Sequence, residues 1–125
     1  MSHVRVLVVD EDADVLELTE TFLEREAEDL DVRTEADPRD AVDRVAAEDV
    51  DCVVTDLRMP GLDGIELATR VADGEGVPVF LFTAADDPAT RERVEEAPVA
   101  DVVRKGVGTD HYAKLASRIL AAVGE

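Results

Sequence analysis

Charged and hydroxyl side chains follow several apolar segments of the chain, each at the position where a segment ends. They are Asp10, Glu11, Asp56, Thr83 and Lys105. Two carboxylates about 4 Å apart repel each other by about 4 kcal/mol near a protein surface, so acids gathered at one site need a cation. Oxygen ligands of this kind favour Mg²⁺, whereas zinc prefers histidine or thiolate. An aspartate beside such a metal is a nucleophile suited to accepting a phosphoryl group.

The ammonium group of Lys105 and the hydroxyl of Thr83 suit the same reaction. Together with the metal they would hold the oxygens of a phosphoryl group on Asp56, which is mostly positioning and charge stabilisation. His3 and His111 are expected to be a tail residue and a helix-surface residue, without partners for catalysis. The phosphoryl donor is therefore expected to be another molecule.

Short apolar segments rich in β-branched residues predict the strands that position these side chains. The segments are Val4 to Val9, Val32 to Ala36, Cys52 to Thr55, Val77 to Phe82 and Val99 to Val103. The first, third and fourth are apolar nearly throughout, which is typical of parallel strands covered on both faces. The second and fifth contain polar residues and are expected at the edges of a sheet.

Segments with helical periodicity lie between these strands and after the last one. One helix face is predicted for Val15, Leu16, Leu18, Phe22 and Leu23, and another for Tyr112, Leu115, Ala116, Ile119, Leu120 and Val123. Strands alternating with helices predict a single α/β domain over residues 1–125, with a doubly wound parallel sheet. Ligands of such sheets bind beyond the carboxyl ends of the strands, where the side chains described above are expected to converge.

Capping residues predict where the remaining helices begin. Asp37 and Asp87 each precede a proline, which favours an N-cap followed by the first helical residue. Asp63 with Glu66 has the pattern of a capping box. The helix predicted in segment 88–97, "PATRERVEEA", has little apolar surface, so it is expected to pack weakly and move easily.

The composition excludes several classes of function. The chain has 31 acidic and 13 basic residues and a net charge of -18, which disfavours direct contact with nucleic acid or an anionic membrane. No apolar run approaches the roughly 20 residues needed to span a bilayer, and the first residues lack the pattern of an export signal, so export is not expected. Cys52 is the only cysteine and is expected to be a buried strand residue, which fits a reducing cytoplasm. The acidic, lysine-poor composition also resembles that of proteins from halophilic archaea, where salt screens self-repulsion.

Four segments carry a family resemblance that covers essentially the whole chain. "LVVDEDADVL", "VVTDLRMPGLDGIEL", "FLFTA" and "DVVRKG", in this order and spacing, resemble a response-regulator receiver domain of two-component phosphorelays. The resemblance implies a flavodoxin-like (βα)5 fold with strand order 2-1-3-4-5, as chemotaxis members of the family illustrate. It implies that Asp56 is the phosphoacceptor and that Asp10 and Glu11 are the acidic pair that binds Mg²⁺. The main-chain carbonyl of Arg58 would complete the metal shell. Thr83 would be the switch hydroxyl, and Lys105 the lysine that pairs with the phosphoryl group.

The resemblance also implies partners. Family members accept the phosphoryl group from a histidine kinase and signal through the fourth helix, fifth strand and fifth helix to a downstream protein effector. By this interpretation the chain is a signalling switch that promotes its own phosphorylation and dephosphorylation, and is not an enzyme acting on a separate substrate.

Three positions depart from the family pattern. Val102 stands where an aromatic switch residue is common, which puts an inward ring rotation in doubt. Gly106 follows Lys105 where proline is usual, so the geometry of that loop is open. Glu11 replaces the commoner aspartate, and its extra methylene still reaches a metal.

Two alternatives stay open at the level of sequence. "VVDEDAD" also begins like an aspartate-based phosphatase of the haloacid dehalogenase type, with Asp10 as nucleophile and Asp12 as its partner, although Asp14 stands where threonine or valine is usual. The chain is also short for the cap domain of such enzymes. The second alternative is a receiver-like binding module that no longer accepts phosphate, which the full acidic set disfavours.

Overall fold

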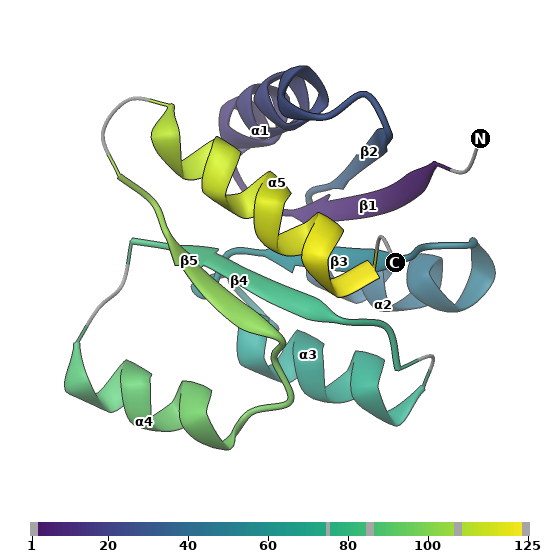
Figure 1. Cartoon of the computed structure of the whole chain (residues 1–125). Coiled ribbons are helices and arrows are strands. Elements are labelled where there is room, and N and C mark those ends of the chain that lie inside the picture. Colours follow the sequence, from purple (N-terminus) through teal and green to yellow (C-terminus); the bar gives the residue numbers. More distant parts are fainter. Residues whose placement is uncertain (1–2, 75, 85–86, 107–108, 124–125) are drawn as a thin grey trace.

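The computed structural model describes residues 3–74, 76–84, 87–106 and 109–123. Strands and helices alternate along the chain (Figure 1). Their bounds are β1 Val4–Val9, α1 Ala13–Glu26, β2 Leu30–Glu35, α2 Pro38–Ala47, β3 Cys52–Thr55, α3 Gly64–Asp73, β4 Val79–Thr83, α4 Pro88–Glu96, β5 Asp101–Arg104 and α5 Asp110–Val123.

The strands form one parallel sheet in the order β2-β1-β3-β4-β5. Helices α1 and α5 cover one face, and α2 and α3 cover the other (Figure 1). The predicted doubly wound, flavodoxin-like fold and its strand order are therefore confirmed, and β2 and β5 lie at the edges as expected.

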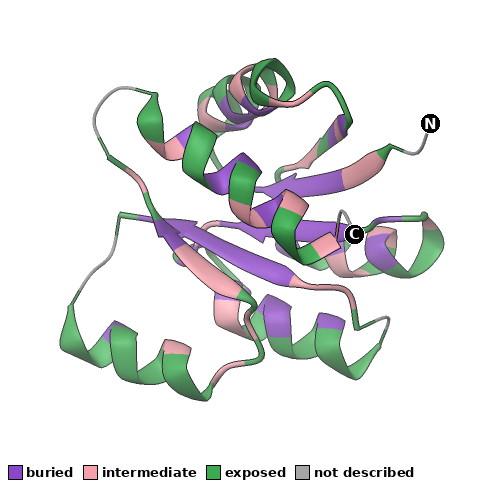
Figure 2. Ribbon diagram, in the orientation of Figure 1, coloured by how far each residue is buried: buried purple, intermediate pink, exposed green. Residues whose placement is uncertain are grey.

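Burial on both faces explains why the central strands are apolar nearly throughout. All residues of β3 and β4 are buried, and so are the last four of β1 (Figure 2). Cys52 is fully buried, and burial, with a smaller contribution from the charge of Asp51, raises the pKa of its thiol to about 12. The expectation that Cys52 is a small core residue is confirmed.

The predicted caps are present. The carboxylates of Asp37, Asp63 and Asp87 each accept a hydrogen bond from a backbone N–H in the first turn of α2, α3 and α4. At α3 the capping box is complete, because Asp63 accepts from the Glu66 N–H while Glu66 accepts from the Asp63 N–H. Local spacing was therefore sufficient to place these helix starts.

Some strand bounds differ from those predicted. The fourth strand begins at Val79 instead of Val77, because Pro78 between them has no N–H to donate to a neighbouring strand. The second begins at Leu30, where the polar Asp31 interrupts the apolar pattern but pairs with arginines at the sheet edge. These shifts leave the carboxyl ends of the strands close to where they were expected.

Helix α4 is the least anchored helix. Its only buried residue in the described chain is Thr90, and Figure 2 shows its outer surface exposed along its length. This agrees with the prediction of weak packing.

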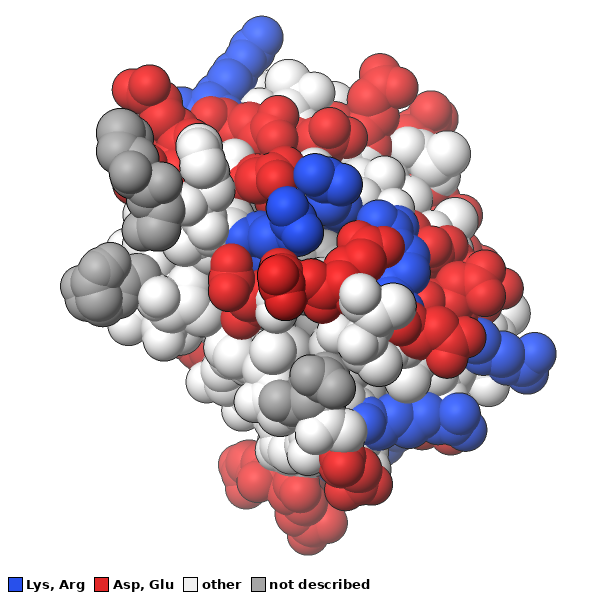
Figure 3. Space-filling view, turned by 90° about the vertical axis from the view of Figure 1, so that its right-hand side faces the viewer, with Lys and Arg blue, Asp and Glu red and all other residues white. Residues whose placement is uncertain are grey.

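Acidic side chains outnumber basic ones on the face seen in Figure 3, as expected from the net charge of -18. None of the helices in the described residues is both long and apolar enough to cross a bilayer.

Candidate functional site

Four of the predicted side chains come together at the carboxyl edge of the sheet. Asp10 follows β1 and is buried, Asp56 follows β3 and is half-buried, and Thr83 ends β4 and is buried. Lys105 follows β5 and is also half-buried. Because all strands run parallel, their carboxyl ends bring these groups to one place.

The ammonium group of Lys105 lies between two carboxylates. Its Nζ is 3.2 Å from Oδ2 of Asp10 and 3.7 Å from Oδ2 of Asp56. It also lies over the Phe82 ring, 5.5 Å from the centroid, an arrangement that favours a cation electrostatically. A single positive charge therefore offsets the repulsion between Asp10 and Asp56 in this state.

The two aspartates differ in how their oxygens are engaged. For Asp10, Oδ1 accepts from the Asp12 N–H at 3.0 Å and Oδ2 accepts from Lys105. For Asp56, Oδ1 accepts from the Leu57 N–H at 2.8 Å, whereas Oδ2 has its ion-pair contact at 3.7 Å, beyond hydrogen-bond range. Asp56 is thus the more accessible of the two carboxylates.

Asp56 faces a cavity of about 390 Å³. The cavity is lined by Asp56, Arg58, Thr83, Ala84 and Lys105. A hydroxyl, an ammonium and a carboxylate thus surround one space, as the sequence predicted. The main-chain N–H of Lys105 donates to the Thr83 carbonyl at 3.0 Å, which ties the two residues across β4 and β5.

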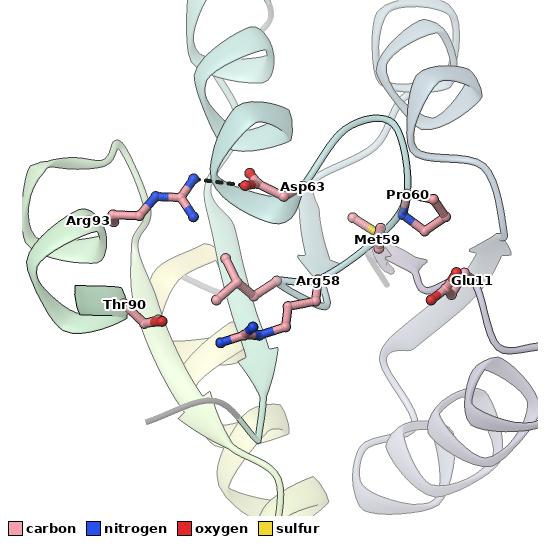
Figure 4. Close-up of a pocket in the computed structure, with 8 residues that line it drawn as sticks. Glu11, Arg58, Met59, Pro60, Asp63, Thr90 and Arg93 are labelled. Atoms are coloured by element: carbon pink, nitrogen blue, oxygen red, sulfur yellow. Dashed lines mark hydrogen bonds and ion pairs between the residues drawn. The ribbon is translucent and has the colours of Figure 1, made fainter. Parts of the chain in front are cut away.

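Glu11 lies apart from this cavity. It is exposed and lines a neighbouring cavity of about 460 Å³ between the loop after β3 and helix α4, together with Arg58, Asp63, Thr90 and Arg93 (Figure 4). Arg58 lines both cavities, so the two cavities are neighbours on either side of this residue.

The donor set suits a hard cation. Asp10 and Asp56 offer carboxylate oxygens, which are ligands that Mg²⁺ accepts while it keeps several waters. Within the described residues, no three His, Cys, Asp or Glu side chains are grouped closely enough to form a metal site by themselves. The residues therefore fit Mg²⁺ only with main-chain and water ligands, and the assignment of Glu11 and of the Arg58 carbonyl stays a prediction.

Two glycines shape the loop that carries Asp56 into α3. Gly61 has φ +88°, a left-handed conformation that glycine adopts without strain. A Cβ at Gly64 would lie 2.4 Å from the carbonyl oxygen of Asp56 and 2.9 Å from a methyl carbon of Leu81. The first turn of α3 therefore packs directly on the Asp56 backbone, and only glycine fits there.

Two arginines connect this loop with α4. Arg58, whose side chain is exposed as expected, pairs with Asp87 at 3.3 Å, and Arg93 pairs with Asp63 at 2.8 Å. Burial alone would raise the pKa of Asp63, but the hydrogen bond from Arg93 and those from backbone N–H groups lower it overall. No sequence signal revealed these pairs, because their partners are distant along the chain.

The expectation for His111 was incomplete. It lies on α5 but is half-buried, with its ring 5.3 Å from that of Phe82 and 4.2 Å from that of Tyr112. Its Nδ1 accepts a hydrogen bond from the Gly106 N–H at 3.3 Å. The signal in the sequence was the glycine after Lys105, which supplies an N–H that proline lacks.

Comparison with known proteins agrees with this geometry. A family model described as response regulator receiver domain matches residues 6–117. The transcriptional regulatory protein ResD of Bacillus subtilis is 31% identical over 104 residues, which are 83% of this chain and 42% of ResD. The haem response regulator HssR of Staphylococcus epidermidis is 30% identical over 102 residues, which are 82% of this chain and 45% of HssR. The chain thus spans less than half the length of these relatives.

A solved structure shows the same fold. The chemotaxis protein CheY4 of Vibrio cholerae superposes with a TM-score of 0.83 at 20% identity, over 95% of this chain and all of CheY4. Sheet order, converging side chains and family match agree, and the phosphatase alternative is not favoured. The chain belongs to the response regulator receiver domains, the phosphoacceptor switches of two-component signalling.

Proposed function

We propose that residues 1–125 form one receiver domain that accepts a phosphoryl group on Asp56 from the histidine of a partner kinase. The observation that carries this proposal is the Lys105 ammonium group, which lies 3.2 Å from Asp10 and 3.7 Å from Asp56 at the edge of the Asp56 cavity. The more accessible oxygen of Asp56 faces a positive charge and a hydroxyl, which is what a transferred phosphoryl group requires.

In the proposed reaction, Oδ2 of Asp56 attacks the phosphorus of a phosphohistidine. A P–O bond forms, the P–N bond breaks, and the leaving imidazole keeps the electron pair and takes a proton. Lys105 then pairs with a phosphoryl oxygen and Thr83 donates its hydroxyl to another. Because both groups already line the cavity, the chain supplies positioning and charge stabilisation with little rearrangement.

We infer that Asp10, Glu11, Asp56 and the Arg58 main-chain carbonyl would hold Mg²⁺ beside the reacting group. When bound, the ion neutralises negative charge on the phosphoryl oxygens. Glu11 lies in the adjacent cavity, and its carboxylate could reach the metal directly or through a retained water.

We propose that the output is a protein effector contacted through α4, β5 and α5. The net charge of -18 opposes direct binding of this domain to nucleic acid or an anionic membrane, and the reduced, buried Cys52 fits a cytoplasmic location. The chain acts as a switch that turns over its own phosphoryl group. The relatives are named a transcriptional regulatory protein (ResD) and a haem response regulator (HssR), which supports a regulatory role.

We further propose that the chain comes from a salt-rich cytoplasm, such as that of a halophilic archaeon. Its many acidic groups repel one another in dilute buffer and are screened within a few Å in molar salt. The melting temperature is expected to rise with KCl concentration. A melting temperature that does not change with KCl would contradict the proposal.

The phosphoacceptor is tested by incubation with acetyl phosphate and Mg²⁺, followed by intact mass measurement and mapping of the modified residue. Wild type is expected to gain one phosphoryl group on Asp56, and Asp56→Asn none. Mapping to Asp10 would instead support the phosphatase alternative, and labelling of the Asp56→Asn variant would refute the assignment. No labelling of folded wild type, with Mg²⁺ present, would favour the binding module. Repetition with candidate kinases would identify the donor.

A further inference from the structure

The backbone on either side of Lys105 is tied to a different element. On one side, the Lys105 N–H donates to the Thr83 carbonyl of β4 at 3.0 Å. On the other, the Gly106 N–H donates to Nδ1 of His111 on α5 at 3.3 Å. Lys105 is thus held between the sheet and α5 at the position from which it reaches both carboxylates.

His111 is itself fixed by ring contacts. Its ring lies 5.3 Å from Phe82 and 4.2 Å from Tyr112, and Tyr112 stacks on Phe22 of α1 at 5.0 Å. Phe82 also carries the Lys105 ammonium group over its ring at 5.5 Å. The imidazole is therefore packed against the same side chain that supports the lysine.

Gly106 is not required for steric reasons. An added Cβ would meet only Nδ1 of His111, at 3.9 Å, which is an ordinary contact, and the residue has no left-handed φ. The chemical feature that this position provides is its N–H, which proline at the same place would lack. The hydrogen bond to His111 is therefore the contact by which the described structure joins Gly106 to α5.

We propose that His111 is a positioning residue, whose neutral ring accepts from Gly106 and so holds Lys105 toward Asp10 and Asp56, and whose protonation on Nδ1 releases that loop. This inference rests on the proposed role of Lys105 in phosphoryl transfer. It makes acceptance of a phosphoryl group sensitive to pH through a residue that touches neither the donor nor Asp56.

The surroundings of His111 favour its neutral form. Burial lowers the pKa of the imidazole, the positive charge of Lys105 lowers it further, and Asp110 on the same helix acts in the opposite direction. Among the described residues, Tyr112 of α5 and the uncharged Phe82 of β4 make ring contacts with the imidazole. At neutral pH, Nδ1 is therefore available as an acceptor.

Two substitutions separate the hydrogen bond from the packing. His111→Asn places an amide oxygen near the position of Nδ1 but removes the ring, whereas His111→Phe keeps a ring and removes the acceptor. His3→Phe is the matched control, because His3 is exposed at the start of β1 and is the only other histidine. The measurement is the initial rate of phosphorylation by acetyl phosphate with Mg²⁺, from pH 5 to pH 8 (about the range in which a histidine titrates).

At pH 8, His111→Phe is expected to react about threefold to tenfold more slowly than wild type, the loss expected for one hydrogen bond, while His111→Asn stays within about twofold. On acidification, the wild-type rate should show an additional decrease as His111 becomes protonated. Both His111 variants should lack this decrease, and His3→Phe should retain it. Three results would each overturn the inference. The first is a His111→Phe rate equal to that of wild type, and the second is a His111→Asn rate as low as that of His111→Phe. The third is a His111→Asn variant whose rate still shows the additional decrease at acidic pH.

A second readout does not depend on phosphorylation. The amide proton of Gly106 should shift in NMR spectra with the titration of the His111 ring, and should not shift over that range in His111→Asn. If wild type is not labelled on Asp56, the proposed function fails while this titration still reports on the hydrogen bond. If wild type is labelled on Asp56 but the Gly106 signal ignores His111, only the present inference fails.

Discussion

Arg93 on α4 donates a hydrogen bond at 2.8 Å to Asp63, the carboxylate that also caps α3. The two oxygens of Asp63 are divided between these tasks, since Oδ1 accepts from the Glu66 N–H and Oδ2 from Arg93. A reciprocal contact joins Arg58, in the loop after β3, to Asp87, which caps α4. Polar contacts between arginines and helix caps thus attach helix α4 to the loop after β3 and to the start of α3.

Asp63 is expected to stabilise the fold in two separable ways. Asp63→Asn keeps a good N-cap and loses only the ion pair, so it should cost less than about 1 kcal/mol. Asp63→Ala also loses the cap and should cost about 1 kcal/mol more. Urea unfolding at neutral pH measures both values. Equal stability of the two variants would show that the cap contributes nothing.

The same contact predicts a pH dependence. Because the folded state lowers the pKa of Asp63, its contribution is complete above the unfolded value of about 3.9 and is lost as pH falls through the folded value. The stability difference between wild type and Asp63→Asn should therefore shrink on acidification below about pH 4. A difference that stays constant down to pH 2, or about two pH units below the unfolded pKa, would exclude this linkage.

Removal of the arginine contact should loosen α4 without unfolding the domain. Arg93→Gln is expected to speed amide hydrogen exchange in residues 89–96 severalfold, because Thr90 is the only α4 residue that the described structure buries. Exchange in β3 and β4 should not change. Arg33→Gln, at an edge-strand ion pair far from α4 in sequence, is the matched control. Exchange that rises equally in all elements would point to global destabilisation instead.

Gly64 is expected to tolerate no side chain. In Gly64→Ala the new Cβ would lie 2.4 Å from the Asp56 carbonyl oxygen, so backbone must move, at a cost of about 1–3 kcal/mol. Gly74→Ala is the control, since its nearest contact would be an ordinary 3.5 Å. Thermal unfolding compares the two variants. Labelling of Asp56 should slow in Gly64→Ala, because the residue that moves is the proposed phosphoacceptor.

Lys105→Ala should separate chemistry from signalling. The variant removes the positive charge between Asp10 and Asp56, so phosphorylation is expected to slow but still reach Asp56. The signal should weaken, because the ion pair between the lysine and the bound phosphoryl group is lost. A reconstituted pathway measures the output, with Lys114→Ala on the exposed surface of α5 as the control. A normal signal from Lys105→Ala would exclude its coupling role.

Much of the architecture was predictable because its causes are local or periodic. Nearly continuous apolar runs identified β1, β3 and β4, since strands buried on both faces are mostly apolar. Cap spacings identified the starts of α2, α3 and α4, since a cap acts within one turn. The prediction that reactive side chains follow the strand ends needed only the parallel direction of the sheet.

The sequence by itself determined which groups reach the carboxyl edge, because strand length and direction place Asp10, Asp56, Thr83 and Lys105 there. Only the tertiary structure decided how they pair. Lys105 shares its charge between two carboxylates because the ends of β1, β3 and β5 meet there, and His111 accepts from Gly106 because α5 packs beside the end of β5. These ion pairs and hydrogen bonds depend on how the packed helices and strands are placed relative to one another. Residue spacing along the chain does not reveal that arrangement.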